Sequence, residues 1–288
     1  MEMEQPDLTV LNLGAGVQST CLYLMATNGE TKNKPDIAIF SDTGWEPPEV
    51  YQHLERLKTH GDIPINIVSH GNLRDDVLER MDKWRNNKGK WGHVGQPPFY
   101  VKVSGEASEA KGMPPDRGGT LWRECTQEYK IKPITKEIRR LLGYTKGQRV
   151  KKKVHQWFGI SLDEMQRMRI NQLKWTENIY PLIEMRMDRN DCINWLTKNG
   201  WGNVPKSACI GCPYHHNRQW RDMKHNKPEQ WADAVSFDAE LRNGKYPMVT
   251  GDVYLHRSHV PLDKVDLSTP EDRGQLSFLD ECEGMCGV

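Results

Sequence analysis

The sequence has no run of about 18 apolar residues, so no membrane-spanning helix is expected. It contains neither an internal repeat nor a long low-complexity tract. Residues 1–5 are acidic and lack the basic and then apolar regions of a secretory signal. We therefore expect a soluble, cytoplasmic protein with no membrane partner. The formal net charge is only +1, from 40 Lys and Arg against 39 Asp and Glu, which hides local asymmetry.

Basic residues are concentrated in one stretch of the chain. Residues 139–153 include seven Lys or Arg and no acid, whereas residues 263–283 include seven acids and two bases. A basic stretch attracts phosphate groups, although a solvated loop has the same composition. Lys151, Lys152 and Lys153 are therefore candidate nucleic-acid-binding residues.

Segments with strand character alternate with helical segments in the first two thirds of the chain. The expected strands are 8–13, 36–40, 63–68, 154–160 and 179–183, and the expected helices are 19–26, 47–60 and 73–84. Strands separated by helices of about 10–15 residues are typical of βαβ units and of a parallel sheet covered on both faces. The sequence predicts an α/β fold with a doubly wound, mostly parallel sheet.

The chain is expected to fold into two parts. Residues 1–200 would form the α/β nucleotide-binding domain, interrupted by a long loop rich in Gly and Pro at 85–119. Loops of this length are usually functional lids or disordered insertions. Residues 201–288 would form a helical appendage that carries cysteines.

A glycine-containing loop follows the first expected strand. Glycines permit a tight turn, and the backbone N–H groups at a helix N-terminus bind phosphate. The loop lacks the Gly-Lys-Ser/Thr ending of a Walker loop, and an ordinary β-to-α turn is the alternative reading. The candidate phosphate-binding residues are Gly14, Ala15, Gly16, Gln18, Ser19 and Thr20.

A second loop, Asp42-Thr43-Gly44, follows the second expected strand. In open α/β sheets, ligands bind beyond the carboxyl ends of the strands, so both loops should line one crevice. Thr43 and Gly44 join the nucleotide-binding candidates. Asp42 is a catalytic candidate that would hold a ribose, a metal or a reacting water, and its alternative role is that of a helix cap or turn residue.

Asp163 and Glu164 follow a later expected strand. Either carboxylate is a candidate general acid or base in the same crevice. The commoner role of acids at such a position is to provide negative charge at the N-terminus of a helix.

Seven cysteines in a reducing compartment favour metal or redox use over a full disulfide framework. Cys209 and Cys212 have the spacing of two thiolates that share one metal or cluster. Cys21 and Cys192 lie on expected helices and are interpreted as core residues.

The two loops resemble those of the phosphoadenosine phosphosulfate (PAPS) reductase-like branch of the PP-loop superfamily, which has the adenine nucleotide α-hydrolase (HUP) fold. The resemblance continues at residues 123–134, 159–164, 180–182 and 206–215, in an order similar to that of compact reductase-like proteins of phages and mobile elements. It spans most of the chain. One departure concerns Gln18, which stands where the family loop, Ser-Gly-Gly-x-Asp-Ser, has its acid. Magnesium-assisted ATP cleavage therefore does not carry over with the fold.

The resemblance also implies a four-thiolate site. Cys125 matches the cysteine of the family's Cys-Thr signature. The four expected ligands are Cys125, Cys209, Cys212 and Cys286, and Cys282 is the alternative to Cys286. Relatives that handle sulfur favour a [4Fe–4S] cluster, and structural zinc is the alternative.

Aromatic and basic side chains are interleaved at several places. The chain has ten Trp, with basic neighbours at Trp84, Trp91, Trp122 and Trp220. Bases stack on such aromatics while cations meet phosphates, although core packing also explains many Trp residues. Nucleic acid, DNA in particular, is the expected partner, and Arg123, Lys130 and Lys132 join the candidate contacts.

These features favour an enzyme that acts on a nucleotide moiety, most of all on a base within nucleic acid. Its reaction would be base modification, which needs ATP, or hydrolysis of the N-glycosidic bond, in a phage or anti-phage context. One alternative is a sulfonucleotide reductase acting on a free nucleotide, with Cys282 or Cys286 as nucleophile. Another is a non-catalytic module that binds nucleic acid or senses a nucleotide.

Overall fold

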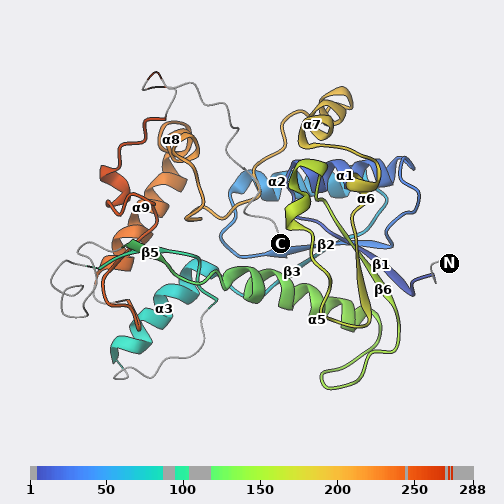
Figure 1. The fold of residues 1–288 in the computed structure, drawn as a ribbon, viewed down its shortest axis with the longest axis horizontal. Coiled ribbons are helices and arrows are strands. Elements are labelled where there is room, and N and C mark those ends of the chain that lie inside the picture. The colour runs from blue at the N-terminus through green and yellow to red at the C-terminus, as the bar shows by residue number, and fades with distance from the viewer. Residues whose placement is uncertain are drawn as a thin grey trace.

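The computed structural model describes residues 5–86, 95–103, 118–243 and 246–269, together with residues 272 and 274. A five-stranded sheet in the order β3-β2-β1-β6-β7 forms its first unit, and all four strand pairings are parallel (Figure 1). The predicted α/β class and the mostly parallel sheet are therefore confirmed. The strands are β1 (Leu8–Asn12), β2 (Ile37–Asp42), β3 (Ile65–Ser69), β6 (Val154–Phe158) and β7 (Thr176–Ile179).

Helices cover both faces of this sheet. Figure 1 shows α1, α2 and α7 on one face and α5 on the other. Each face has its own core, one including Leu11, Leu54 and Cys192 and the other including Val10 and Ile138. Burial on both faces explains why β1 and β2 consist of nearly continuous apolar residues. The helices are α1 (Val17–Thr27), α2 (Pro48–His60), α5 (Lys132–Leu141), α6 (Pro181–Glu184) and α7 (Arg189–Lys198).

The strand order reverses between β1 and β6. In chain order the five strands are arranged 3-2-1-4-5, so the connections leave β1 in one direction and β6 in the other. Such a switch point opens a crevice at the carboxyl ends of the two strands, where ligands bind in open α/β sheets. The phosphate-loop candidates follow β1 directly and therefore lie at this switch point.

A second unit lies beyond the carboxyl ends of the parallel strands (Figure 1). Its antiparallel sheet has the order β5-β4-β8, and its core includes Val77, Phe99, Trp220 and Phe237. These residues come from both sides of position 200, so the expected domain boundary crosses one hydrophobic core. The elements are α3 (Leu73–Asn86), β4 (Tyr100–Lys102), β5 (Gly118–Thr120), α8 (Asn217–Asn226), α9 (Pro228–Arg242), β8 (Asp252–Tyr254) and the 3-10 turn η3 (Leu262–Lys264).

The expected loop at 85–119 is only partly described. Residues 95–103 and 118–119 belong to the second unit through β4 and β5. The remainder of the loop, residues 87–94 and 104–117, lies outside the described residues.

One expected strand is misplaced. For residues 179–183 the structure has the end of β7 at Ile179, followed by the one-turn helix α6. Pro181 starts this helix, because a proline needs no N–H partner in a first helical turn and cannot donate to a sheet. Within the described parts of the chain, no helix has the length and apolar character needed to cross a membrane.

The end of β6 packs directly on the start of α1. A Cβ atom at Gly159 would lie 2.7 Å from both the Cα and the N atom of Ser19. Side-chain carbons do not approach backbone atoms this closely, so only glycine fits at this position. The absence of a side chain at Gly159 thus fixes where α1 begins relative to the sheet.

We predict that Gly159→Ala destabilises the fold by about 1–3 kcal/mol, since the added methyl group must push α1 away from β6. Gly119→Ala is the matched control, because a Cβ atom there meets nothing within 4 Å. Urea unfolding followed by circular dichroism measures both. Equal stabilities of the two variants would contradict the proposed close contact.

Candidate functional site

The loop between β1 and α1 presents an uncapped helix N-terminus. Ala15 is buried with a positive φ of 57°, and Gly16 occupies the N-cap position without a side-chain hydrogen bond. The first helical hydrogen bond runs from the Thr20 N–H to the Gly16 carbonyl. The N–H groups of the preceding turn and the helix dipole both favour an anion at this point.

Ser207 lies directly over this loop. A Cβ atom at Gly14 would lie 3.8 Å from Ser207 Oγ, and one at Gly16 would lie 3.4 Å from Ser207 Cβ. Ser207 belongs to the linker between α7 and α8, which therefore crosses the phosphate loop. The sequence motif at 206–215 contains Ser207, but nothing in its spacing assigns it to this loop.

Gln18 is buried and fixed by two partners. Its Nε2 donates to Ser161 Oγ at 3.3 Å, and its Oε1 accepts from Arg189 Nη1 at 3.0 Å. The Arg189 N–H in turn donates to Asp163 Oδ1 at 3.0 Å. Gln18 therefore joins α1 to the end of β6 and to α7, and it contributes no charge to the loop. The sequence gives no sign of Arg189, which lies far along the chain.

The two hydroxyl groups predicted to bind phosphate have different surroundings. Ser19 Oγ donates to the Gly16 carbonyl at 3.2 Å and stays at the loop. Thr20 Oγ1 lies 2.9 Å from His53 Nε2, in the buried contact between α1 and α2. The structure thus engages Thr20 in helix packing and does not bring its hydroxyl group to the loop.

Asp42 closes the turn after β2. Its Oδ1 accepts hydrogen bonds from the Gly44 N–H at 2.7 Å and from the Tyr51 hydroxyl at 2.8 Å. Burial, followed by the hydrogen bond to Asp42, raises the pKa of Tyr51. Gly44 is required here because its φ is +70° and a Cβ atom would lie 2.8 Å from Asn72 Cα. Asp42 therefore has the expected role of a turn residue through its Oδ1. Among the described residues, no hydrogen bond reaches its other oxygen, Oδ2.

Thr43 contacts a cysteine and a buried acid. Thr43 Oγ1 donates to Glu46 Oε1 at 3.0 Å and lies 3.2 Å from Cys209 Sγ. Glu46 is only 4% exposed, and its Oε2 has no hydrogen-bond partner within the described chain. Burial raises the pKa of Glu46, while the charge of Lys130 opposes that shift. The analysis of the sequence missed Glu46, because an acid before Pro47 looks like an ordinary helix-start residue.

The Cys209–Cys212 segment sits on Trp45. A Cβ atom at Gly211 would lie 2.0 Å from Trp45 Cη2, so glycine is required between the two cysteines. The Ile210 N–H donates to the Trp45 carbonyl at 2.9 Å, and Trp45 Nε1 donates to Asp233 at 2.6 Å. The cysteine segment and the loop after β2 therefore form one packed unit.

Cys125 precedes a π-helix, η1 (Thr126–Ile131). The π-helix is held on the sheet by Tyr129, whose hydroxyl donates to Asp76 at 2.6 Å and whose carbonyl accepts from Ser41 at 2.5 Å. Short π-helical turns are frequent at functional sites. Burial raises the pKa of the Cys125 thiol, and the charges of Lys130 and Arg123 oppose this shift.

The described residues do not complete the expected metal site. Burial, and then the negative charge of Glu46, raise the pKa of Cys209 well above its ordinary range. Cys286 and its alternative Cys282 lie outside the described residues. Among the residues that are described, including Cys125 and Cys212, no three His, Cys, Asp or Glu side chains are grouped so as to hold a metal ion. The [4Fe–4S] cluster and its zinc alternative therefore stay predictions, and no catalytic step is derived through them.

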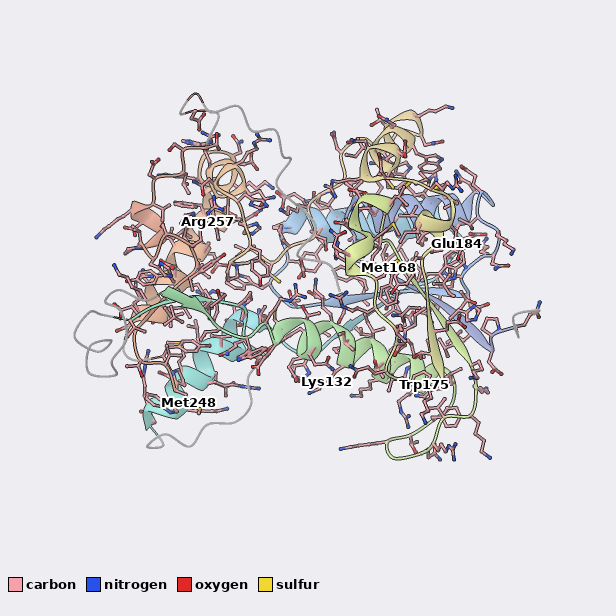
Figure 2. All side chains as sticks on the ribbon, in the orientation of Figure 1. Lys132, Met168, Trp175, Glu184, Met248 and Arg257 are labelled. Atoms are coloured by element: carbon pink, nitrogen blue, oxygen red, sulfur yellow. The ribbon has the colours of Figure 1, made fainter. Side chains whose placement is uncertain are left out.

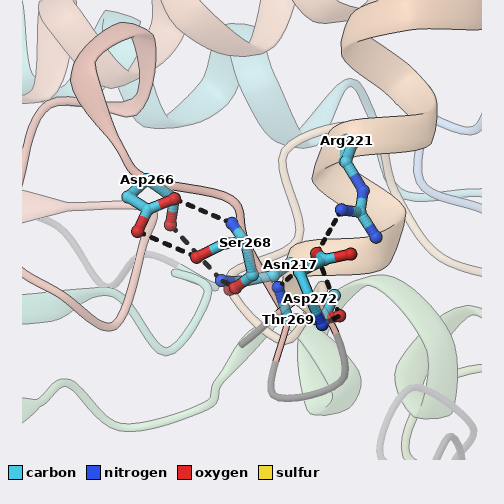
Figure 3. Close-up of polar contacts among 6 residues, drawn as sticks. All are labelled: Asn217, Arg221, Asp266, Ser268, Thr269 and Asp272. Carbon is cyan, nitrogen blue, oxygen red and sulfur yellow. Dashed lines mark hydrogen bonds and ion pairs between the residues drawn. The ribbon is translucent and has the colours of Figure 1, made fainter. Parts of the chain in front are cut away.

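The tail of the described chain is fastened to α8, which begins soon after Cys212. Asn217 Nδ2 donates to the Ser268 carbonyl at 2.9 Å, and Arg221 forms an ion pair with Asp272 (Figure 3). Asp272 also accepts from the Thr269 N–H at 2.7 Å. These contacts hold residues 268, 269 and 272 on the first two turns of α8.

Asp163 and Glu164 take part in structural contacts. Both lie in the 3-10 helix η2 (Leu162–Arg167). Glu164 is buried and forms an ion pair with Arg167 at 2.6 Å, and burial raises its pKa while Arg167 opposes the shift. Asp163 accepts from the first N–H group of α7, so it provides negative charge at a helix N-terminus.

The predicted nucleic-acid-binding residues do not converge on the crevice. Arg123 is exposed, Lys132 forms an ion pair with Glu128, and the charge of Lys130 acts on Cys125 and Cys209. The exposed residues 151–153 precede β6, so they lie at the amino end of the strands. Five residues of β6 separate them from the crevice by roughly 17 Å.

The tryptophans divide between the core and the surface. Trp220 is fully buried in the second core, so the expectation that it contacts nucleic acid is wrong. Trp122 is 85% exposed and remains compatible with that expectation. Cys21 and Cys192 are fully buried, as expected for core residues.

A cavity of about 490 Å³ lies beside the linker, between α2 and residues 202–205. Its wall includes His53, Arg56 and Lys227. The Arg56 guanidinium is held 3.8 Å from the centre of the Trp201 ring and donates to the Gly200 carbonyl. A cavity of this size suits a small ligand.

Solved structures include chains that are similar to this one. No family model and no curated protein matches the chain. The crystal structure of PAPS reductase from Candida auris, in complex with phosphate, is similar with 14% identity over 68% of this chain and 73% of that chain, at a TM-score of 0.39. A likeness of this size says nothing about activity. The mostly parallel sheet, its flanking helices and the C-terminal helices agree with the α/β fold class that the sequence predicts.

We predict that protonation of His53 destabilises the protein in acid. His53 is 5% exposed, and burial together with Arg56 lowers its pKa to about 4. In the unfolded chain a histidine binds a proton near pH 6.5, whereas the folded protein keeps His53 neutral down to about pH 4. The contribution of neutral His53 to the free energy of unfolding is therefore present above pH 6.5 and is lost as the pH falls to 4. In His53→Gln, the loss of stability between pH 7 and pH 4.5 should be smaller by about 2 kcal/mol.

Urea unfolding at a series of pH values measures this difference. His225→Gln, at an exposed position of α8, is the matched control. An unchanged pH dependence in His53→Gln would show that His53 is not the group responsible.

Proposed function

We propose that this protein is an enzyme that acts on a nucleotide within nucleic acid and excises its base without cleaving ATP. The observation that carries the proposal is the neutral Gln18 at the phosphate loop, held by Ser161 and Arg189. An amide at this position offers no carboxylate to a magnesium ion, which binds nucleotides through carboxylates and phosphates. The loop is therefore suited to phosphate binding and not to the activation of ATP.

Binding of the substrate phosphate uses the start of α1. The uncapped first turn supplies N–H donors, and the hydroxyl groups of Ser19 and Ser207 lie beside it. A phosphate placed there sits at the switch point of the sheet, next to the loop that carries Asp42. A base in a duplex must leave the stack to reach this crevice.

Asp42 is proposed as the general base. The hydrogen bonds from Gly44 and Tyr51 fix Oδ1 and leave Oδ2 to accept a proton from water. The water oxygen bonds to the sugar C1′ as the bond between C1′ and the base nitrogen breaks. The base nitrogen takes up a proton from solvent, and Asp42 later returns to solvent the proton that it accepted. A positioned general base of this kind contributes about 10²–10⁴-fold to the rate.

We expect the purified protein to release a free base from DNA in the absence of ATP. Mass spectrometry of products from unmodified and phage-modified DNA, with and without ATP, measures this. Asp42→Asn should lower the release rate by about 100-fold or more while keeping DNA affinity, because only proton transfer is lost. Asp62→Asn, at an exposed loop position, is the control.

Other products would replace the proposal. An altered nucleoside formed only with ATP would establish base modification and PP-loop chemistry despite Gln18. Reduction of a free sulfonucleotide, with no action on DNA, would establish the reductase alternative. Binding to DNA without any product, unchanged in Asp42→Asn, would establish a binding module.

The expected four-cysteine site has its own test. Anaerobically purified protein should contain iron and sulfide in equal amounts, and Cys209→Ala should lose both. Cys192→Ala, at a buried core position of α7, is the control that should keep them. Zinc instead of iron would identify the structural alternative, and a protein with neither metal would contradict the site.

A further inference from the structure

Residues 165–175, from the second half of η2 to the start of β7, expose several apolar side chains. Met165, Met168, Ile170 and Leu173 are 48%, 37%, 96% and 37% exposed. Single exposed apolar residues are ordinary, whereas a group within one short segment marks an interaction site. Met168 and Trp175, labelled in Figure 2, show where this segment runs on the first unit.

The segment is held firmly against β7. The Tyr180 hydroxyl accepts from the Arg169 N–H at 2.9 Å and donates to the Arg169 carbonyl at 2.8 Å. Asn171 Nδ2 donates to Asn178 Oδ1 at 2.9 Å. Ile170 lies between these two anchored residues, so its side chain is presented to solvent from a fixed backbone.

The same segment is basic. Residues 165–175 include Arg167, Arg169 and Lys174 and no acid. Arg167 forms an ion pair with Glu164, which offsets its charge. Arg169 donates to the backbone carbonyls of residues 166 and 168, and because these carbonyls are uncharged, Arg169 keeps its positive charge.

The predicted basic residues 151–153 adjoin this segment. Lys153 Nζ lies 3.5 Å from the Lys174 carbonyl, so the two basic stretches meet at the amino end of β6. Two acids lie nearby. Asp7 accepts from the Lys153 N–H, and Glu177, on β7, lies 3.6 Å from His155.

Together, residues 151–153 and 165–174 form a strip along β6 and β7. One end lies at Arg169, tied to Tyr180 just after β7, and the other at Lys153, just before β6. Because β6 and β7 are paired in parallel, the strip has about the length of a strand, roughly 17 Å. This length matches about five base pairs of duplex, at about 3.4 Å of helix axis each.

The strip begins four residues after a residue of the candidate site. Ser161, at the start of η2, contacts Gln18 at the phosphate loop. A strand that follows the strip from Lys153 towards Arg169 is therefore led to the crevice.

We propose that this strip is a nucleic-acid track and that Ile170 inserts between stacked bases. The proposal rests on the proposed function, since it assumes that the substrate is nucleic acid. The lysines and Arg169 match a polyanion, and Ile, Leu and Met are side chains that proteins wedge into base steps. Such a wedge unstacks the neighbouring base, which extrusion into the crevice requires.

Two variants test the track on a fluorescein-labelled DNA duplex and on the same duplex containing 2-aminopurine. Lys152→Glu should weaken binding by about tenfold and lower the slope of log affinity against log salt by about 1, through the loss of a phosphate contact. Ile170→Asp should abolish the rise in 2-aminopurine fluorescence that reports unstacking. The controls are Lys32→Glu and Met248→Asp, which change an exposed lysine and an 84% exposed methionine elsewhere.

Three outcomes overturn the track. If the wild type binds DNA and both variants behave like it, the strip is not used and the proposed function stands. If the wild type binds no nucleic acid, the proposed function fails and the track with it. If Ile170→Asp turns a dimer into a monomer in sedimentation without changing DNA affinity, the apolar residues contact a second copy of the chain.

Discussion

The candidate site depends on one close contact, that between Gly159 at the end of β6 and the backbone of Ser19 in α1. The contact lets Gln18 reach Ser161, and Gln18 in turn holds Arg189 of α7. One chain of packing and hydrogen bonds thus joins the end of β6 to two helices, α1 and α7, near the switch point. The direction of the N–H groups at the start of α1 is set by this chain of contacts, because those groups belong to the turn that Gly159 supports.

The second half of the site depends on the second unit. Trp45 follows β2, yet its ring packs on Phe237 of α9 with the ring centres 4.6 Å apart. Gly211 rests on the same ring, which places Cys209 against Thr43 and Glu46. Displacement of α9 would therefore move the acidic and cysteine side chains together while leaving the phosphate loop on its own support.

Sequence patterns predict most strands and helices of this protein, but they predict the contacts of its candidate site only in part. The strands β1 and β2 were predictable because burial on both faces demands nearly continuous apolar residues. The strand expected at 179–183 failed because Pro181 favours a first helical turn over sheet pairing.

The contacts within the site join residues that lie far apart in the chain. Ser207 over Gly14, Arg189 on Gln18 and Cys209 beside Glu46 are contacts that no local spacing encodes. At Thr20 the local sequence pattern and the tertiary contact point to different roles. Its place in the loop pattern suggested phosphate binding, but the tertiary contact with His53 takes its hydroxyl group.

The neutrality of Gln18 bears on which phosphate the loop can hold. A carboxylate at this position would lie beside Arg189, which would offset part of its charge. The remaining negative charge would repel an incoming phosphate unless a cation bridged the two. The amide keeps the hydrogen bonds to Arg189 and Ser161 and leaves the positive potential of the α1 N-terminus uncompensated. A singly charged phosphodiester can then bind directly, whereas a triphosphate brings more charge than one helix N-terminus balances without a metal. Under the proposed function, this charge balance matches the loop to a phosphodiester of a nucleic-acid backbone.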